Sequence, residues 1–354
     1  MKKQQIRNST LELLRILSMF MILGLHYIAP QIGGGLQTTV PANLLFLHVA
    51  ESACIPAVNV FVLISGYFLC EKKTTGLRKA VELYLVMVVI DLALLLFGVL
   101  HGDCIFSFRA LAISLVPFAF GQHWFLETYI LLLLFLPFLN LLLERLSQSA
   151  HALLIGIQML IFSLWPSFLP SSPLTDNGYG LTNFITVYLI AAYLRRHVHF
   201  RNQKASAVFG LLGWLFSVAI IAVSSYIPYL QSQAWRYCYL FAITASVGIF
   251  VFFLNLPAFF NRAVNLISST VFDIYIAHAF VLLQPFVYEE LMKIPKYRDS
   301  AFLPLHFILC VMLQFLVFSI MGLLRRMLWK PTAGRMLSKS RILQREEAWE
   351  QSIL

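Results

Sequence analysis

The chain has 354 residues, of which 60% are apolar and only 12% are charged, and its formal net charge is +10 at pH 7. Soluble domains carry roughly 25% charged residues, so this composition excludes a soluble enzyme and indicates a polytopic membrane protein embedded in a lipid bilayer. The cytoplasmic loops of such a protein collect Lys and Arg. They account for the positive charge, and we expect no nucleic-acid partner.

Ten apolar runs are long enough to cross a bilayer, which takes about 17 to 25 residues. They cover residues 11–30, 43–70, 80–100, 124–143, 151–168, 181–194, 206–228, 237–258, 267–288 and 302–324. The sixth run is short and residues 110–120 are ambiguous, so the count carries a margin of one. The sequence therefore predicts an all-α bundle of about ten spans in a single membrane domain, 1–330, followed by a basic and mixed cytoplasmic tail, 331–354.

The distribution of Lys and Arg predicts the orientation. With ten spans, 20 of the 26 basic residues fall on the side that holds both termini, and five fall on the other side. Basic residues concentrate in cytoplasmic loops, so we expect both termini in the cytoplasm and a multi-pass protein of the cytoplasmic (inner) membrane. The first run is too long for a cleaved signal and lacks a small-residue cleavage site, so it is expected to be a retained span.

The first run contains two ionisable residues, Arg15 and His26. Eleven residues of helix correspond to roughly 16 Å and about three turns, so both side chains are predicted to lie on one face. An ionisable group inside a span is costly and normally faces a protein interior or a cavity with a functional role. The alternatives are that Arg15 extends to the lipid headgroups and that His26 only packs between helices.

The second run ends in Ser65-Gly66-Tyr67, and a basic cluster follows it directly. A Ser-Gly pair inside a span lets another helix approach closely, which is the structural interpretation of this motif. The cluster either sets the topology of the chain or binds an anionic ligand such as a nucleotide-like phosphate. Its members are Lys72, Lys73, Arg78 and Lys79.

Later runs add further intramembrane ionisable groups. Glu127 lies one turn inside the run that starts at Trp124, and Asp273 and His278 lie in the ninth run. Trp124 is also typical of an interfacial aromatic belt, whereas a carboxylate at this depth needs a partner. The outer half of the bundle is thus predicted to hold His26, Glu127 and His278, and a histidine near its ordinary pKa can accept a proton from a hydroxyl.

Two other kinds of chemistry use the same residue types. Metal binding needs several ligands at suitable spacing, and the chain has no local HxxxH pattern, so we expect no metal. Proton-coupled transport remains open on these residues alone.

Four motifs, in this order along the chain, resemble those of acyltransferase family 3, integral membrane proteins that acylate sugars on cell-surface glycans and other acceptors. The first is an arginine followed after ten residues by a histidine, and the second is a Ser-Gly-Tyr signature. The third is a Trp-Phe-Leu entry to a later span, and the fourth is a Tyr-x-x-His segment near the C-terminus. They fall on Arg15 and His26, on Ser65-Gly66-Tyr67, on Trp124-Phe125-Leu126, and on Tyr275 and His278.

The resemblance implies that His26 is the catalytic histidine and that Arg15 helps to hold an acyl-CoA donor. The family's basic motif, Arg-Arg-x-x-Arg-Leu, is matched only in part by Arg78-Lys79-Ala80-Val81-Glu82-Leu83. We assign donor binding to Arg15, Ser65, Lys72, Lys73, Arg78 and Lys79.

The resulting hypothesis is a membrane O-acyltransferase that moves an acyl group, most simply acetyl, from cytoplasmic acyl-CoA to a hydroxyl of a cell-surface or lipid-linked glycan. It needs no permanently bound cofactor, and transfer is expected to be direct, with Ser65 and Tyr67 as candidates for an acyl-enzyme. His26, Glu127 and His278 are the predicted catalytic residues, and Trp124, Tyr67 and Asp273 are the predicted substrate contacts.

Other functions remain possible at this point. A transporter or flippase of a glycan or lipid-linked precursor is the main alternative, and a glycan polymerase or a sensor that kept only the fold is a weaker one. Some family members carry a second, extracytoplasmic hydrolase-like domain. This chain ends about 30 residues after the last predicted run, so we expect it to act alone or with a separate partner.

Overall fold

The structure is a computed structural model that describes residues 8–72, 76–169 and 176–338, with side chains described as far as 328. Helices make up 79% of it, and the described residues contain no strand. The all-α prediction is therefore confirmed. Lys73 and the part of the predicted tail at 339–354 lie outside the described residues.

Most predicted runs correspond to one helix or to a broken pair. The long helices are α1 (Ser9–Ile28), α4 (Leu77–His101), α6 (Trp124–Arg145), α10 (Gln203–Ser224) and α16 (Leu303–Ser338). Three pairs have only a short irregularity between them: α2 (Pro41–Cys54) with α3 (Ala57–Leu69), α7 (Gln148–Met159) with α8 (Trp165–Phe168), and α13 (Arg262–Ser268) with α14 (Val271–Ala279). The first two pairs, Pro41–Leu69 and Gln148–Phe168, each count as one helix long enough to cross a membrane. The remaining helices are α5 (Phe108–Leu115), α9 (Leu181–His197), α11 (Gln231–Ala234), α12 (Leu240–Leu254) and α15 (Ile294–Tyr297).

The number of membrane spans stays a prediction. Within the described residues, 7 helices are long and apolar enough to cross a membrane, or 8 if the pair Arg262–Ala279 and Val281–Tyr297, bent by 64°, counts as one span. The apolar helix α12 has 15 residues, which rise about 22 Å and fall short of a hydrocarbon core of about 30 Å. The count of ten and the orientation of the termini are thus not confirmed.

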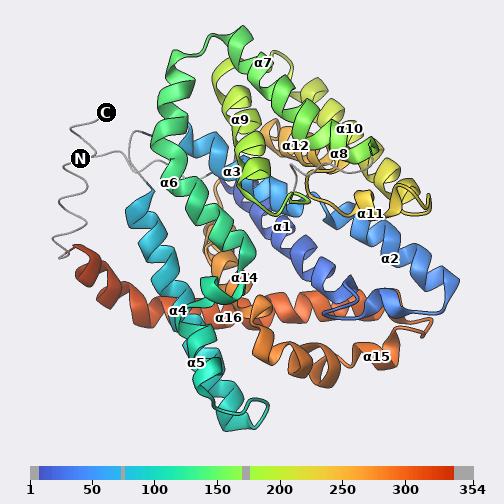
Figure 1. The fold of residues 1–354 in the computed structure, drawn as a ribbon, viewed down its shortest axis with the longest axis vertical. Helices are drawn as coiled ribbons and strands as arrows, with labels where there is room; N and C mark the ends of the chain where they lie inside the picture. Colours follow the sequence, from blue (N-terminus) through green and yellow to red (C-terminus); the bar gives the residue numbers. More distant parts are fainter. Residues whose placement is uncertain (1–7, 73–75, 170–175, 339–354) are drawn as a thin grey trace.

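Helix α1 lies in the middle of the bundle, where it contacts α2, α3, α12, α13, α14 and α16 (Figure 1). Its first turn is held by polar contacts: Asn8 accepts a hydrogen bond from the Thr10 backbone N–H, and the Ser9 hydroxyl donates to Asn265 Oδ1 over 2.9 Å. Most of its remaining side chains are buried. Because neighbours cover α1 on several sides, polar groups on it face protein and cavities.

The chain turns sharply after α1, directly behind His26. The Gly33 backbone N–H donates to the His26 carbonyl over 2.9 Å, and a Cβ at Gly33 would lie only 2.3 Å from the Tyr27 carbonyl oxygen. Tyr27 donates from its hydroxyl to Nδ1 of His306 on α16 over 2.8 Å. These contacts fix the end of α1, and with it the position of His26.

Helix α14 lies beside α1 and brings the last predicted motif to it. An ion pair between Asp273 and Arg325 joins α14 to α16, with Arg325 Nη2 3.2 Å from Asp273 Oδ2. Asp273 is 1% exposed and Arg325 is 17% exposed. This buried pair holds α14 in place.

Candidate active site

Two histidines that are 252 positions apart in sequence meet where α1 and α14 come together. His278 Nε2 lies 3.2 Å from His26 Nδ1, and the two rings pack edge to face with centroids 4.4 Å apart. His278 is 2% exposed. The structure therefore brings together two of the three residues that the sequence analysis assigned to catalysis.

The hydrogen bonds of this pair determine where the protons lie on the neutral rings. His26 Nδ1 lies 3.0 Å from the Ile22 carbonyl, and His278 Nδ1 lies 3.0 Å from the Ile274 carbonyl. A carbonyl only accepts, so each Nδ1 carries the hydrogen and each Nε2 keeps a lone pair. His278 Nε2 then accepts from the N–H of His26 Nδ1, and Nε2 of His26 remains free to take up a proton.

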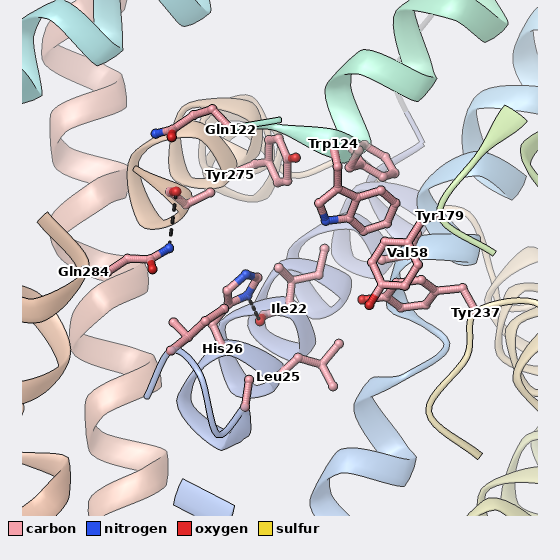
Figure 2. A pocket seen from close by; sticks show the side chains of 14 residues that line it. Ile22, Leu25, His26, Val58, Gln122, Trp124, Tyr179, Tyr237, Tyr275 and Gln284 are labelled. Atoms are coloured by element: carbon pink, nitrogen blue, oxygen red, sulfur yellow. Dashed lines mark hydrogen bonds between the residues drawn. The ribbon is translucent and has the colours of Figure 1, made fainter. Parts of the chain in front are cut away.

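His26 lines a cavity of about 330 Å³, called here the His26 cavity. Figure 2 shows its imidazole projecting from α1 into this space, with Gln122 and Gln284 on one side and Trp124, Tyr179 and Tyr237 on the other. The cavity thus combines a proton acceptor, two amide side chains and a cluster of aromatic rings.

Three aromatic residues of the His26 cavity form a packed cluster. The rings of Trp124 and Tyr237 are stacked with centroids 5.4 Å apart, and Tyr179 lies 4.5 Å from Trp124. Burial raises the pKa of Tyr179 further above the ordinary value of about 10 for a tyrosine, so its phenol is protonated at neutral pH. The cluster presents apolar faces together with hydroxyl groups.

Arg15 lines a second cavity of about 280 Å³, called here the Arg15 cavity. Its polar lining includes Arg15, Lys79, Ser65, Tyr129, Ser268 and Ser269. Arg15 Nη1 donates to Glu12 Oε1 over 2.9 Å, and Lys79 Nζ donates to Glu82 over 3.0 Å. A guanidinium has five N–H donors, so this ion pair leaves Arg15 with donors for a ligand.

Arg15 and His26 thus line two different cavities, although both lie on one face of α1. Ile22, between them in sequence, lines both cavities. The positions 15, 22 and 26 differ by seven and four residues, which is about two turns and about one turn of helix.

Of the other predicted site residues, Trp124 lines the His26 cavity, whereas Glu127, Asp273, Ser65 and Tyr67 do not line it. Among the residues that the structure describes, Glu127 has no hydrogen bond or ion pair to either histidine, and its Oε1 is buried without a partner. Asp273 pairs with Arg325. Ser65 accepts a hydrogen bond from the Tyr129 hydroxyl over 3.1 Å in the Arg15 cavity, and the Arg195 guanidinium lies over the Tyr67 ring, 5.2 Å from its centroid.

The basic cluster is only partly at a cavity. Lys72, Arg78 and Lys79 are exposed, and of these Lys79 lines the Arg15 cavity. Arg195, which is not part of this cluster, forms an ion pair with Glu71 over 3.0 Å. Among the residues that the structure describes, Lys79 and Arg15 are the basic side chains that line the Arg15 cavity.

Several residues at the His26 cavity were not assigned a role from the sequence. Gln122, Tyr179, Tyr237, Tyr275 and Gln284 all line it, and Gln122 Nε2 is buried without a hydrogen-bond partner. Gln122 stands two positions before Trp124, and Tyr275 is the tyrosine of the Tyr-x-x-His segment. The motifs therefore gave a signal for Gln122 and Tyr275. Tyr179, Tyr237 and Gln284 come from loops or irregular turns that carry no motif.

A buried pair of an acid and a histidine was also not assigned a role from the sequence. His123 Nε2 lies 2.9 Å from Asp91 Oδ2, and both side chains are 0% exposed. It joins α4 to the start of α6, where Trp124 begins. We interpret it as a structural pair that fixes the entry of α6 into the site.

The comparisons with known proteins place this chain in a family. A family model described as an acyltransferase domain, Acyl_transf_3, matches residues 8–324. The searches of curated proteins and of solved structures gave no match. Because the family model covers nearly the whole chain, and seven to eight described helices are able to cross a membrane, the protein belongs to acyltransferase family 3 and is a multi-pass membrane acyltransferase.

Proposed function

We propose that the protein is an O-acyltransferase that moves a small acyl group, most simply acetyl, from acyl-CoA to a hydroxyl of a cell-surface or lipid-linked glycan. The observation that carries this proposal is the histidine pair: His26 lines a cavity with Nε2 free, and its Nδ1 contacts His278. A base held by a second group beside a cavity is the arrangement that activates a hydroxyl.

In the proposed reaction, the acceptor hydroxyl oxygen forms a bond with the thioester carbonyl carbon while its proton passes to His26 Nε2. The carbon–sulfur bond then breaks, and CoA leaves as the thiol with the proton that His26 returns. Direct transfer suits the geometry, because Ser65 lines the Arg15 cavity and not the cavity that holds His26.

His278 has a supporting role in this mechanism. When His26 takes the proton it becomes positively charged, and its Nδ1–H still faces the lone pair of His278 Nε2 at 3.2 Å. A hydrogen bond from a charged donor is roughly twice as strong as one between neutral groups. His278 therefore favours the protonated form of His26 during transfer and keeps the ring in position.

The donor is proposed to enter through the Arg15 cavity from the cytoplasm. Arg15 and the exposed Lys79 supply positive charge there, which suits the phosphates of a nucleotide-like donor. The predicted orientation puts this end of α1 at the cytoplasmic face, where acyl-CoA is available. The thin pantetheine arm of CoA would then extend along α1 toward His26.

The acceptor is proposed to occupy the His26 cavity. Sugars have apolar faces that pack on aromatic rings and hydroxyls that bond to amides, and the cavity offers both: Trp124 and Tyr237 on one side, Gln122 and Gln284 on the other. The unpartnered Nε2 of Gln122 is a donor available for an acceptor hydroxyl.

The test of this function is acyl transfer by the protein in its membrane. Surface glycans from cells with and without the protein are compared by mass spectrometry, and purified protein in lipid nanodiscs is given labelled acetyl-CoA. We expect an acyl mass on the glycan that depends on the protein, and CoA release in vitro. Unchanged glycan acylation together with less glycan at the surface would instead indicate a transporter.

The role of Arg15 leads to a prediction about donor affinity. Replacing Arg15 with methionine should raise the KM for acyl-CoA by about 10-fold or more, because a hydrogen bond to a charged group contributes about 1.5–3 kcal/mol, and leave kcat nearly unchanged. Steady-state kinetics in nanodiscs measure both constants. Arg15→Lys, which keeps a charge beside Glu12, should recover part of the affinity.

Arg145→Met is the control for this experiment. Arg145 is exposed at the end of α6 and lines neither cavity. An equal rise in KM for Arg145→Met, or a fall in kcat alone for Arg15→Met, would contradict donor binding by Arg15.

A further inference from the structure

Three side chains from three helices separate the two cavities. Ile22 of α1, Phe125 of α6 and Tyr275 of α14 each line both the His26 cavity and the Arg15 cavity. The rings of Phe125 and Tyr275 pack against each other with centroids 5.4 Å apart. We call these three residues the wall.

The wall is one layer of side chains thick, because the same residues are reached from both sides. Ile22 precedes His26 by four residues, about 6 Å of helix, and its carbonyl accepts from His26 Nδ1 over 3.0 Å. Tyr275 also lies close to the histidine pair, because its ring is 5.7 Å from the ring of His278. A group that reaches His26 from the Arg15 cavity therefore has to pass between these side chains.

We propose that the wall selects the length of the acyl chain, with Ile22 as its main specificity-determining residue. This inference rests on the proposed function, in which the donor comes from the Arg15 cavity and the thioester stops beside His26. At that point the acyl chain and the end of the pantetheine arm are in contact with the wall.

Two properties of the site favour a short chain. The His26 cavity, at about 330 Å³, is at the lower end of the usual range of ligand pockets, about 300–1,000 Å³, and it must also hold the acceptor. Ile22 is 4% exposed, and its β-branched side chain is stiff at χ1 in a helix. Neither the cavity nor Ile22 can readily make room for additional methylenes.

The test compares acetyl-, propionyl- and butyryl-CoA as donors for the full-length protein in nanodiscs, with one acceptor glycan. Wild type should prefer acetyl-CoA. In Ile22→Ala, the ratio of kcat/KM for butyryl-CoA to that for acetyl-CoA should rise by about 10-fold or more, since one methylene in an apolar pocket changes discrimination by about 10- to 200-fold. Ile22→Phe should lower the ratio of kcat/KM for propionyl-CoA to that for acetyl-CoA.

Leu23→Ala is the matched control. Leu23 follows Ile22 on the same helix, is 0% exposed, and lines neither cavity. It should lose packing without any change in chain preference. If Ile22→Ala does not fold, Ile22→Val removes one methyl group and should shift the ratio in the same direction.

Two results would overturn the inference: an unchanged ratio in a folded Ile22 variant, or an equal shift in Leu23→Ala. Both leave the proposed function standing, because wild type still transfers acyl groups. A wild-type protein that releases no CoA from any of the three donors would overturn the proposed function as well, so the two failures are distinguishable.

Discussion

Replacing His26 with asparagine is expected to lower acyl transfer by at least about 100-fold, the usual contribution of a general base. The amide nitrogen of asparagine can still donate to the Ile22 carbonyl, as Nδ1 of His26 does over 3.0 Å, but the variant has no lone pair at the position of Nε2. The variant should therefore fold, but the acceptor hydroxyl has no base at this position to take its proton. CoA release in nanodiscs and glycan mass spectrometry measure the loss.

Two further variants show whether the loss is specific. His48→Asn changes another buried histidine that lines neither cavity, and it should keep most of the activity. His278→Asn should lower kcat by less than His26→Asn, with little change in the KM for the donor, because His278 acts through His26. Activity of folded His26→Asn within a few-fold of wild type would exclude His26 as the base.

Replacing Arg325 with methionine is expected to lower the free energy of unfolding by about 3–5 kcal/mol, the cost of leaving a buried charge without its partner. Asp273 is 1% exposed and pairs with Arg325 at the contact between α14 and α16. The neighbouring Arg326 donates to the Ser269 carbonyl over 2.7 Å, so it is already engaged elsewhere. Unfolding of purified protein with increasing denaturant measures the change.

The double variant Asp273→Asn/Arg325→Met separates the cost of an unpaired charge from the value of the pair. Replacing both members of a buried ion pair is often neutral, so the double variant should recover most of the stability that the single variant loses. A single variant within about 1 kcal/mol of wild type would show that the Asp273 carboxylate finds water or another partner. The ion pair would then have no structural role.

The sequence predicted the histidine pair only in part. His26 and His278 were both selected as ionisable residues within apolar runs, and the structure places them 3.2 Å apart. Glu127 and Asp273 were selected by the same criterion, yet Asp273 pairs with Arg325, and the buried Oε1 of Glu127 has no hydrogen-bond partner among the described residues. An ionisable residue in a span requires a partner, but this requirement does not say which one.

The number of spans shows a similar limit. Apolar run length predicted ten, while the described residues contain seven or eight helices that are long enough to span a membrane. The run at 267–288 contains the end of α14 at Ala279, followed by a sharp bend and by short 3-10 and π-helical turns that carry Gln284 to the His26 cavity. Broken helices are tolerated in membrane proteins where protein buries them or a cavity adjoins them, and hydropathy does not register such breaks.

The amino-acid sequence by itself determined that this protein is an all-helical membrane bundle, since only helices can pair the backbone groups of long apolar runs within each run. It also determined that Arg15 and His26 share one face of the first helix, because eleven residues are about three whole turns. Only the tertiary structure decided that Ile22 separates two cavities, that His278 contacts His26, and that Phe125 and Tyr275 complete the wall. The reason is that lipid is as apolar as the residues between packed helices, so the sequence has no polar face to mark which side of a span meets protein.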